Sequence, residues 1–491
     1  MFYSGKYMIF LAVVFFAYWL FLSWRSIPAI ARVLFILGVS YYFYALLNWK
    51  FLALVFLLST VDFLTARFIG ASTNIRRRKL LLGLSIATDI GALATFKYFN
   101  FFSESLASFL GKFGWQVSPQ VLHLAWPVGM SFLAFRSLSY VIDTYRSTKE
   151  TPERPSTKYF DYLAFVSFFP TIETGPLARA HQLLPQFRQQ PTLTSEEGTS
   201  AIFSILVGVV KIAVANFIGT NLVGRVFDQP QLYSSTETLG AIYGYALQIY
   251  LNFSGYIDIA LASALLLGFR LPVNFNSPYR ARNVPDFWRR WHITLSEWLR
   301  DYVFSSLPGS PRKTINLYWK AVVTMLIGGI WHGAGWTFVI WGAMHGLGVA
   351  VNQWWEQRRR KLKRKPRQQW WIKALCVFAT FHFVCLAWVF FRAGSVGQAW
   401  EVLARLGALK FEMANLITPV FTVPIFKLPV SMLVVLILSY LAHWFPKDAL
   451  ERVRGGFTWL PSPMQAALIL SVAIGLYYVS GSEAQFIYGN F

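Results

Sequence analysis

The chain has 491 residues, of which 55% are hydrophobic and only 14% are charged. Soluble globular domains carry about 25% charged residues, so this composition excludes an ordinary soluble protein. Repeated apolar runs long enough to cross a bilayer instead predict an all-α, polytopic integral membrane protein.

The net charge of +23 would point to a nucleic-acid partner in a soluble protein. Here Lys and Arg gather in the connections between apolar runs, as the positive-inside rule expects, and "RRRKLKRKPRQQWWIK" (358–373) is the clearest case. We therefore predict membrane lipid as the surroundings and no nucleic-acid partner. No Cys/His grouping has the spacing of a zinc site, so no metal is predicted.

Hydropathy predicts about eleven or twelve transmembrane or re-entrant helices. The first lacks a small-residue cleavage site, so we expect a retained span and not a signal peptide. In chain order the candidate spans are 8–24, 28–47, 51–66, 80–98, 121–142, 199–222, 238–268, 316–331, 335–352, 371–391, 428–445 and 463–480.

Basic residues concentrate in every second connection, which predicts that both termini lie outside. We expect a single membrane domain over residues 1–491. Its expected parts are N-terminal helices (1–145), cytoplasmic or re-entrant segments (146–198 and 269–315), catalytic helices (316–391) and C-terminal helices (392–491). The two re-entrant segments are apolar but broken, and such backbone is tolerated at membrane depth only when it is buried in protein or lines a wet cavity.

The stretch "FWRRWHITLSEWLRDYVF" (287–304) has helical periodicity. On a helix starting at residue 285, its tryptophans form one apolar face, and Glu297 can pair with Arg300. An interfacial helix with an aromatic belt explains this pattern. It does not explain His292, which lies at the edge of the apolar face one turn from Trp288, and which is therefore a candidate functional residue.

His332 lies in "MLIGGIWHGAGWTFVIWGAMHG", where glycines permit close backbone approach and a broken helix. An ionisable residue at a break within the membrane is a candidate functional residue. His345, two helical turns beyond Thr337, is a weaker candidate. Packing of helices through small residues is the alternative explanation of the glycines.

A carboxylate, Asp258, lies inside the apolar span "QIYLNFSGYIDIALASALLLGF" (248–269). An unpaired acid there is costly, so we expect it to meet a cation, a hydroxyl or a histidine. Asp258, Tyr256 and Ser254 either orient a catalytic base or form a buried hydrogen-bonded cluster.

Several blocks in a fixed order resemble the membrane-bound O-acyltransferases, and in particular the bacterial branch that modifies alginate, peptidoglycan and teichoic acids. The resemblance covers nearly the whole chain. Its blocks are "FKYFNFF" (96–102), "PVGMSFLAFRSLSYVIDTYR" (127–146), "FFPTIETGPLAR" (168–179), "YLNFSGYIDIALASALLLGFRLPVNFNSPY" (250–279), "FWRRWHITLSEWLRDYVF" (287–304), "GGIWHGAGWTFVIWGAMHG" (328–346) and "AQFIYGNF" (484–491).

The resemblance implies a ring of tilted helices around a central tunnel, in a bacterial inner-membrane protein. The family's essential histidine matches His332, its second polar position matches His292, and a further branch-typical histidine matches His345. Trp331 is a possible supporting residue beside His332. The usual "AGP" of the family reads "TGP" (174–176) in this chain.

The activity implied is transfer of an acyl group, most simply acetyl from cytoplasmic acetyl-CoA, with no bound cofactor. His332 would be the general base, and His292 or a nearby donor would hold the thioester carbonyl. A basic face at Arg282, Arg289 and Arg290 would attract the donor's phosphates.

The acyl group would leave outward onto a periplasmic or extracellular acceptor protein or glycan. Three alternatives stay open at this point. The chain could transfer D-alanine to teichoic acid, act as a transporter or channel, or serve as a scaffold for polysaccharide export. A transporter is disfavoured because no paired broken spans occur in corresponding halves.

Overall fold

The computed structural model describes residues 5–22, 27–124, 127–147, 158–309, 314–363, 369–407, 422–423 and 428–479. The fold is that of an all-α integral membrane protein. Two very short strands, β1 (Thr422–Val423) and β2 (Leu428–Pro429), pair antiparallel near its end. The block "AQFIYGNF" and part of the basic run 358–373 lie outside the described residues. The chain forms two compact units, Met1–Ala201 with Ile259–Val273, and Ile202–Asp258 with Asn274–Phe491.

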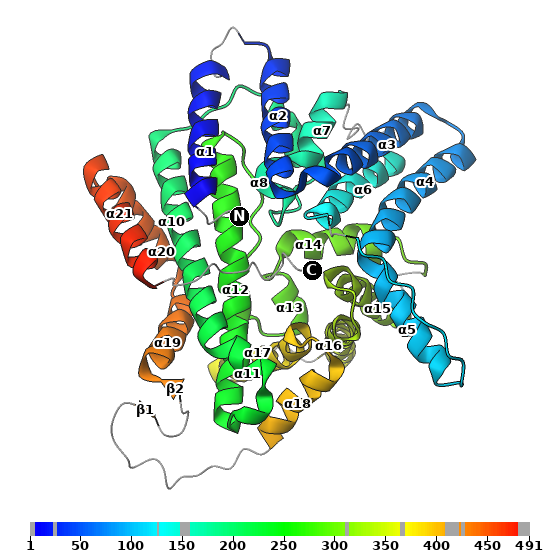
Figure 1. Cartoon of the computed structure of the whole chain (residues 1–491), viewed down its shortest axis with the longest axis vertical. Helices are drawn as coiled ribbons and strands as arrows, with labels where there is room; N and C mark the ends of the chain where they lie inside the picture. The colour runs from blue at the N-terminus through cyan, green and yellow to red at the C-terminus, as the bar shows by residue number, and fades with distance from the viewer. Residues whose placement is uncertain are drawn as a thin grey trace. The chain divides into compact units, whose positions relative to one another are not determined.

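The first unit is built from apolar helices and a set of short helical turns. Within it α3, α4 and α6 pack against one another (Figure 1). Its elements are α1 (Gly5–Ala17), η1 (Tyr18–Leu22), α2 (Ala29–Asn48), η2 (Trp49–Phe51), α3 (Leu52–Ala71), α4 (Ile75–Leu93), η3 (Ala94–Tyr98), α5 (Phe99–Gly111), α6 (Met130–Arg146), α7 (Tyr159–Ser167), α8 (Phe169–Ile172), α9 (Ala180–Leu183), η4 (Leu184–Phe187), the start of α10 (Ser195–Ile218) and the end of α12 (Ser235–Leu266).

The second unit holds the remainder of α10 and α12 and everything that follows them. Its further elements are η5 (Gly219–Val223), α11 (Gly224–Asp228), η6 (Pro230–Leu232), η7 (Pro278–Arg280), α13 (Val284–Trp288), α14 (Ile293–Trp298), η8 (Leu299–Phe304), α15 (Thr314–His332), α16 (Trp336–Lys361), α17 (Trp370–Arg392), α18 (Val396–Gly407), α19 (Val430–Trp444), α20 (Lys447–Trp459) and α21 (Ser462–Val479).

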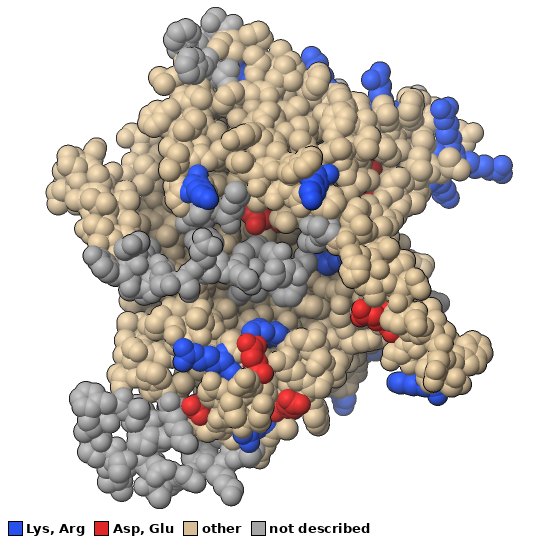
Figure 2. Space-filling view, in the orientation of Figure 1, with Lys and Arg blue, Asp and Glu red and all other residues tan. Residues whose placement is uncertain are grey.

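Five helical segments of the described chain are long and apolar enough to cross a membrane, and a bent pair over α19 and α20 would make a sixth. They are Ala29–Ala71, Ile75–Gly111, Ser195–Asp228, Ser235–Leu266 and Trp370–Arg392. The described chain therefore does not contain eleven or twelve separate helices that are each long and apolar enough to cross a membrane. One reason is that the predicted spans 28–47 and 51–66 fall within one segment. On the face of the molecule that Figure 2 shows, charged side chains occupy little of the surface.

Residues 161–180 of the predicted re-entrant segment 146–198 are buried protein. Residues of α7, of α8 and of the link between them are nearly inaccessible, among them Phe165, Phe168 and Phe169. The sequence predicted breaks at Pro170 and Gly175. Helix α7 ends at Ser167, Pro170 lies in the first turn of α8, and α8 ends at Ile172, before Gly175. Irregular backbone at this depth is thus packed inside the unit, as the cost of unpaired peptide groups in lipid requires.

A polar cluster that the sequence analysis did not single out joins four helices of the first unit. The fully buried carboxylate of Asp62 on α3 accepts a hydrogen bond of 2.5 Å from the Ser85 hydroxyl on α4 and another from Ser137 on α6. The Ser137 hydroxyl also bonds to the Tyr162 hydroxyl on α7, at 2.6 Å. Buried polar groups are stable only when paired in this way.

Glycines bring α15 and α16 into backbone contact in the second unit. A Cβ added at Gly342 would lie 2.6 Å from the Met325 carbonyl oxygen, and one added at Gly346 would lie 2.7 Å from Cα of Val322. Small residues at such positions allow dispersion contacts between helix backbones, which drive helix association in membranes. The α15–α16 hairpin that carries His332 therefore depends on these glycines.

We expect Gly342→Ala to lower stability by about 1–3 kcal/mol, the usual cost of overpacking. The measurement is the midpoint temperature at which the detergent-solubilised chain loses its monodisperse peak. Gly38→Ala is the matched control, because a Cβ there meets nothing within 4 Å on α2. Equal midpoints for the two variants would contradict the close packing of α15 on α16.

Candidate active site

The stretch 287–304 is not the single helix that its periodicity predicts. Helix α13 ends at Trp288, the chain turns, and α14 begins at Ile293. The backbone groups freed by the turn bond to a neighbouring segment, with Asn276 N donating to Arg290 O at 2.9 Å and Ile293 N donating to Asn274 O at 3.0 Å. Tertiary hydrogen bonds thus replace the helical ones, which the sequence periodicity could not reveal.

His292 lies at this break, so its predicted place on the edge of a helical face is wrong. Its backbone has φ 43° and ψ 55°, the left-handed conformation that costs a non-glycine residue about 1–2 kcal/mol. Residues held in such conformations cluster at functional sites. The side chain is 1% exposed and packs edge-on against Phe253 of α12, with ring centroids 4.8 Å apart.

Asn274 determines which nitrogen of His292 carries the proton. The Asn274 Oδ1 accepts hydrogen bonds of 3.0 Å from both the backbone N–H and the hydroxyl of Thr294. A backbone N–H can only donate, so the atom facing it is the amide oxygen. His292 Nδ1 lies 3.3 Å from the same oxygen and must donate to it. His292 Nε2 therefore presents a lone pair.

Burial lowers the pKa of the His292 imidazole from 6.5 to about 3, so the ring is neutral at physiological pH. The unfolded chain, with an ordinary histidine, binds more protons than the folded chain between these two values. The folded state should then lose stability as the pH falls from about 6.5 towards 3. His292→Gln should make this dependence shallower when unfolding is followed from pH 7 to pH 4. A slope identical to that of the unchanged chain would refute the buried neutral ring.

His332 is the last residue of α15, and the chain breaks after it at residues 333–335, as the glycines predicted. Its ring is 3% exposed and lies among aromatic rings. The centroid distances are 4.8 Å to Trp331, 5.0 Å to Trp341 and 5.1 Å to Phe391. This enclosure excludes water from most of the imidazole and strengthens every polar interaction made inside it.

His345 on α16 is fully buried and carries the opposite tautomer to His292. The indole N–H of Trp288 donates to His345 Nδ1 at 3.3 Å, so the proton of the neutral ring lies on Nε2. His345 Nε2 has no hydrogen-bond partner among the residues that the structure describes. The Trp288 contact links this histidine to the segment that carries His292.

Two tryptophans connect the three histidines. Trp331 lies against both His332 and His292, at 4.8 Å and 6.3 Å between centroids. Trp341 lies against both His332 and His345, at 5.0 Å and 4.8 Å. The structure therefore brings together the three histidines and Trp331 that the sequence analysis singled out.

Asp258 has a cation as its partner, one of the possibilities that the sequence left open. Its Oδ2 lies 2.6 Å from the Lys211 ammonium on α10. A Cβ at Gly255, on α12, would lie 2.6 Å from the Gly208 carbonyl oxygen, so the two helices touch beside this pair. Tyr256 and Ser254 are buried on the same helix. The Asp258–Lys211 pair therefore ties α10 to α12, and α12 contacts His292 through Phe253.

The predicted basic face divides into groups with different surroundings. Asp286 accepts from Arg290 Nε at 3.0 Å and lies 3.6 Å from the exposed guanidinium of Arg289. Its second oxygen accepts from the backbone N–H of Arg282 at 3.0 Å. The side chains of Arg282 and Arg289 line two different pockets. Arg290 is held at the turn by Asp286 and does not line either of these pockets.

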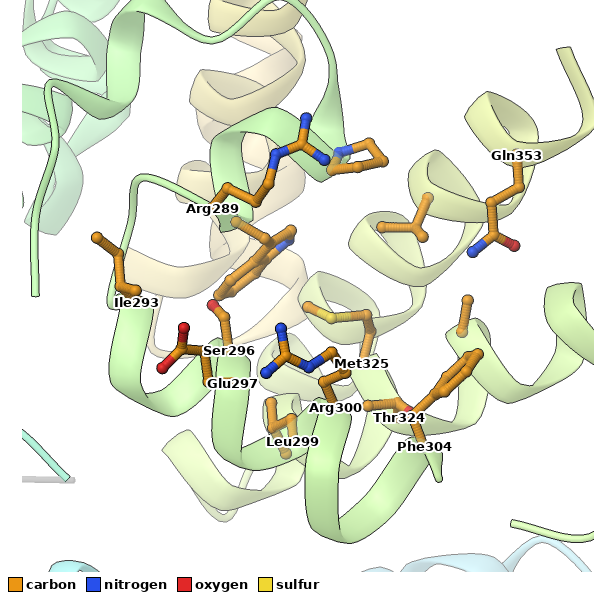
Figure 3. Close-up of a pocket in the computed structure, with 14 residues that line it drawn as sticks. Arg289, Ile293, Ser296, Glu297, Leu299, Arg300, Phe304, Thr324, Met325 and Gln353 are labelled. Atoms are coloured by element: carbon orange, nitrogen blue, oxygen red, sulfur yellow. The ribbon is translucent and has the colours of Figure 1, made fainter. Parts of the chain in front are cut away.

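A pocket of about 570 Å³ opens beside the histidine cluster. Figure 3 shows Arg289 and Glu297 with Arg300 on one side and Gln353 of α16 across from them. Arg300 pairs with Asp301 at 2.8 Å, and the charge of Glu297, its predicted partner, also acts on it. Trp288, the hydrogen-bond donor to His345, forms part of the wall. The volume lies within the range of small-molecule sites.

Sequence reasoning missed Asn274 and Trp341 as contributors to this site. Asn274 stands in a quoted block, "VNFNSPY", but nothing in its pattern indicates a contact with His292 eighteen positions later. Trp341 has the spacing of an ordinary buried helix residue. Both were identified only through their contacts with the histidines.

Comparison with known proteins shows the family to which the chain belongs. The family model described as membrane-bound O-acyltransferase matches residues 79–391. A peptidoglycan O-acetyltransferase of Helicobacter pylori is 30% identical, over 98% of this chain and 95% of its own.

Two further relatives cover less of the chain. A probable alginate O-acetylase of Azotobacter vinelandii is 37% identical over 77% of this chain and 73% of its own. A teichoic acid D-alanyltransferase of Bacillus subtilis is 27% identical over 54% and 68%. The chain is therefore a membrane-bound enzyme, and it belongs to the membrane-bound O-acyltransferase family.

Proposed function

We propose that this O-acyltransferase moves an acetyl group from cytoplasmic acetyl-CoA to an exported cell-surface polysaccharide, directly or through an extracytoplasmic acceptor protein. One observation carries the choice of acetyl. Similarity to a peptidoglycan O-acetyltransferase extends along 98% of this chain, whereas similarity to a teichoic acid D-alanyltransferase extends along 54%. The alginate O-acetylases, at 37% identity over 77% of the chain, support the same acyl group.

In the proposed reaction a hydroxyl oxygen of the acceptor attacks the thioester carbonyl carbon, and the carbon–sulfur bond breaks. His332 takes the hydroxyl proton, which the leaving thiolate of coenzyme A then receives. A base enclosed by aromatic rings is shielded from water, so its proton transfers are confined to the bound reactants. The new oxygen–carbon bond leaves the acetyl ester on the acceptor.

His292 has a different proposed role from the one that the resemblance implies. An imidazole that holds a developing oxyanion must present an N–H, but the Asn274 contact places the proton of His292 on Nδ1. Its Nε2 lone pair suits a hydrogen bond accepted from the acceptor hydroxyl. His292 would thus orient the nucleophile towards the carbonyl carbon, in line with the gain expected from correct positioning.

The pocket beside Trp288 is the proposed entrance for the donor. Arg289 is exposed at its edge and would contact the donor's phosphates, whereas Arg290 shapes the rim through Asp286. Arg289→Gln should raise KM for acetyl-CoA with little change in kcat, the result expected when binding is weakened and chemistry is not. We further propose an inner-membrane location with both termini outside, in line with the distribution of Lys and Arg.

The test uses the purified full chain in lipid nanodiscs, with acetyl-CoA labelled in the acetyl group and the extracytoplasmic acceptor fraction. Release of free thiol together with labelled ester is the expected result. A transporter would carry label without cleaving the thioester. A D-alanyltransferase would leave acetyl-CoA intact and would need a carrier-protein thioester. In a deletion strain, mass analysis should find a surface polymer without its O-acetyl esters, and unchanged esters would refute the proposal.

A further inference from the structure

A second pocket of about 690 Å³ lies in the second unit, apart from the histidine cluster. None of its lining residues is shared with the pocket at Arg289. Its walls come from α12, the turn at η7, α17 and α19. Three cations, Arg280, Arg282 and Lys373, line it together with aromatic side chains. The proposed acetyl transfer uses neither this pocket nor its cations.

The three cations have no carboxylate partner within ion-pair distance among the residues that the structure describes. Arg280 instead places its guanidinium over the Trp444 ring, 5.8 Å from the centroid. Three unpaired positive charges around one pocket produce a field that favours an anion. Arginine and lysine both bind phosphate through charge-assisted hydrogen bonds.

An apolar groove of about 330 Å³ continues from this pocket. The two share Tyr243, Tyr440 and Trp444, and beyond these the groove is lined by aliphatic side chains such as Leu436 and Ile437. The joined surface is therefore amphiphilic, with positive charges at one end and hydrocarbon at the other. A free phosphate or a nucleotide has no apolar part to fill such a groove.

Polar groups at the junction are already paired within the protein. His382 Nδ1 donates to the Phe378 carbonyl at 2.8 Å, so its Nε2 accepts from the Tyr243 hydroxyl at 2.8 Å. The Tyr440 hydroxyl donates to the Tyr243 carbonyl at 2.9 Å. The cations are consequently the polar groups on this surface that are available to a ligand.

The pocket lies beside the first turns of a helix that is long and apolar enough to cross a membrane. Lys373 lies in the first turn of α17, a helix long enough to cross the bilayer. Trp370 and Trp371 at the same end are exposed, as tryptophans at the membrane interface are. Phe378, further along the helix and lining the same pocket, is also exposed. In a bilayer, likewise, the charged headgroup lies at the interface with water and the hydrocarbon chain lies deeper.

We propose that this surface is a binding site for an anionic phospholipid. Its phosphate contacts Arg280, Arg282 and Lys373, and one acyl chain fills the groove along α19. Basic pockets between membrane helices recognise anionic headgroups by this combination of charge and apolar contact. The site is independent of the proposed acetyl transfer, and it removes Arg282 from the expected contacts of the acyl donor.

The experiment is native mass spectrometry of the full chain, titrated with phosphatidylglycerol or phosphatidylcholine of identical acyl chains. We expect phosphatidylglycerol to bind about tenfold more tightly. The triple variant Arg280→Gln, Arg282→Gln, Lys373→Gln should lose this preference. The matched control is Arg76→Gln, Arg77→Gln, Lys79→Gln, which removes the same charge from exposed positions of α4 and should keep the preference.

Three results would overturn the proposal. These are equal affinity for the two lipids, an unchanged preference in the triple variant, and an equal loss in the α4 control. If acetyl-CoA displaces phosphatidylglycerol from the site that the triple variant removes, the pocket belongs to the soluble donor instead. Ile437→Trp fills the groove at an exposed position, so it tests the acyl-chain site without changing the cations. It should weaken phosphatidylglycerol several-fold, and undiminished binding would exclude an acyl chain from the groove.

Discussion

His332→Gln should lower kcat for acetyl transfer by about 10²–10⁴-fold, the contribution usual for a general base. Glutamine approximates the volume of histidine but cannot accept a proton at neutral pH. The ring of His332 is enclosed by Trp331, Trp341 and Phe391, so a side chain of similar size should keep this packing. The measurement is thiol release from acetyl-CoA, with KM determined separately.

His181→Gln is the matched control, because His181 is exposed on α9 of the first unit and should leave kcat unchanged. Both variants must elute as monodisperse chains, which separates loss of chemistry from loss of folding. If the His332 variant keeps more than half of the activity, His332 is not the base and the proposed mechanism fails.

Asn274→Ala should lower kcat by about tenfold to 100-fold although Asn274 is not expected to touch either substrate. Its amide oxygen fixes the proton of His292 on Nδ1 and also satisfies the backbone N–H of Thr294. Without that acceptor the imidazole can adopt the other tautomer, which presents a donor to the hydroxyl instead of a lone pair. At metal sites, loss of a group that hydrogen-bonds to a ligating histidine lowers metal affinity or activity by a similar factor.

Two further variants distinguish positioning from simple packing. Thr294→Val removes one donor to Asn274 Oδ1 but leaves the His292 contact intact, so kcat should change little. Asn274→Asp keeps an acceptor, so it should retain more activity than Asn274→Ala. Its negative charge beside the ring should raise the pKa of His292 above about 3 and shift the pH profile. Equal losses in the Ala and Asp variants, with unchanged profiles, would show that Asn274 serves only the fold.

The histidines show how far the sequence could predict the site. His332 was predictable because glycines on both sides of an ionisable residue indicate a break in a membrane helix, and α15 ends there. His292 was predictable as unusual but not in its conformation. The periodicity of 287–304 is helical, and the break at His292 comes from hydrogen bonds to residues 274 and 276. Periodicity reports which face is apolar and says nothing of such bonds.

The charged residues make the same distinction. A lone carboxylate in an apolar span needs a polar or charged partner, so the sequence predicted that Asp258 has one. It could not choose Lys211, which lies 47 positions away on another helix. The three arginines near His292 looked like one basic face. The fold places Arg282, before α13, and Arg289, at the end of α13, in the walls of different pockets.

The sequence by itself determined that this chain is an all-α membrane protein and that it resembles the membrane-bound O-acyltransferases, and it singled out three histidines as candidates. Those conclusions rest on composition, hydropathy and residue order, which are properties of the chain alone. Only the tertiary structure decided the left-handed backbone of His292, the tautomers of His292 and His345, and the division of the arginines. Each depends on a hydrogen bond or contact between residues distant in sequence, and such contacts exist only once the helices have packed.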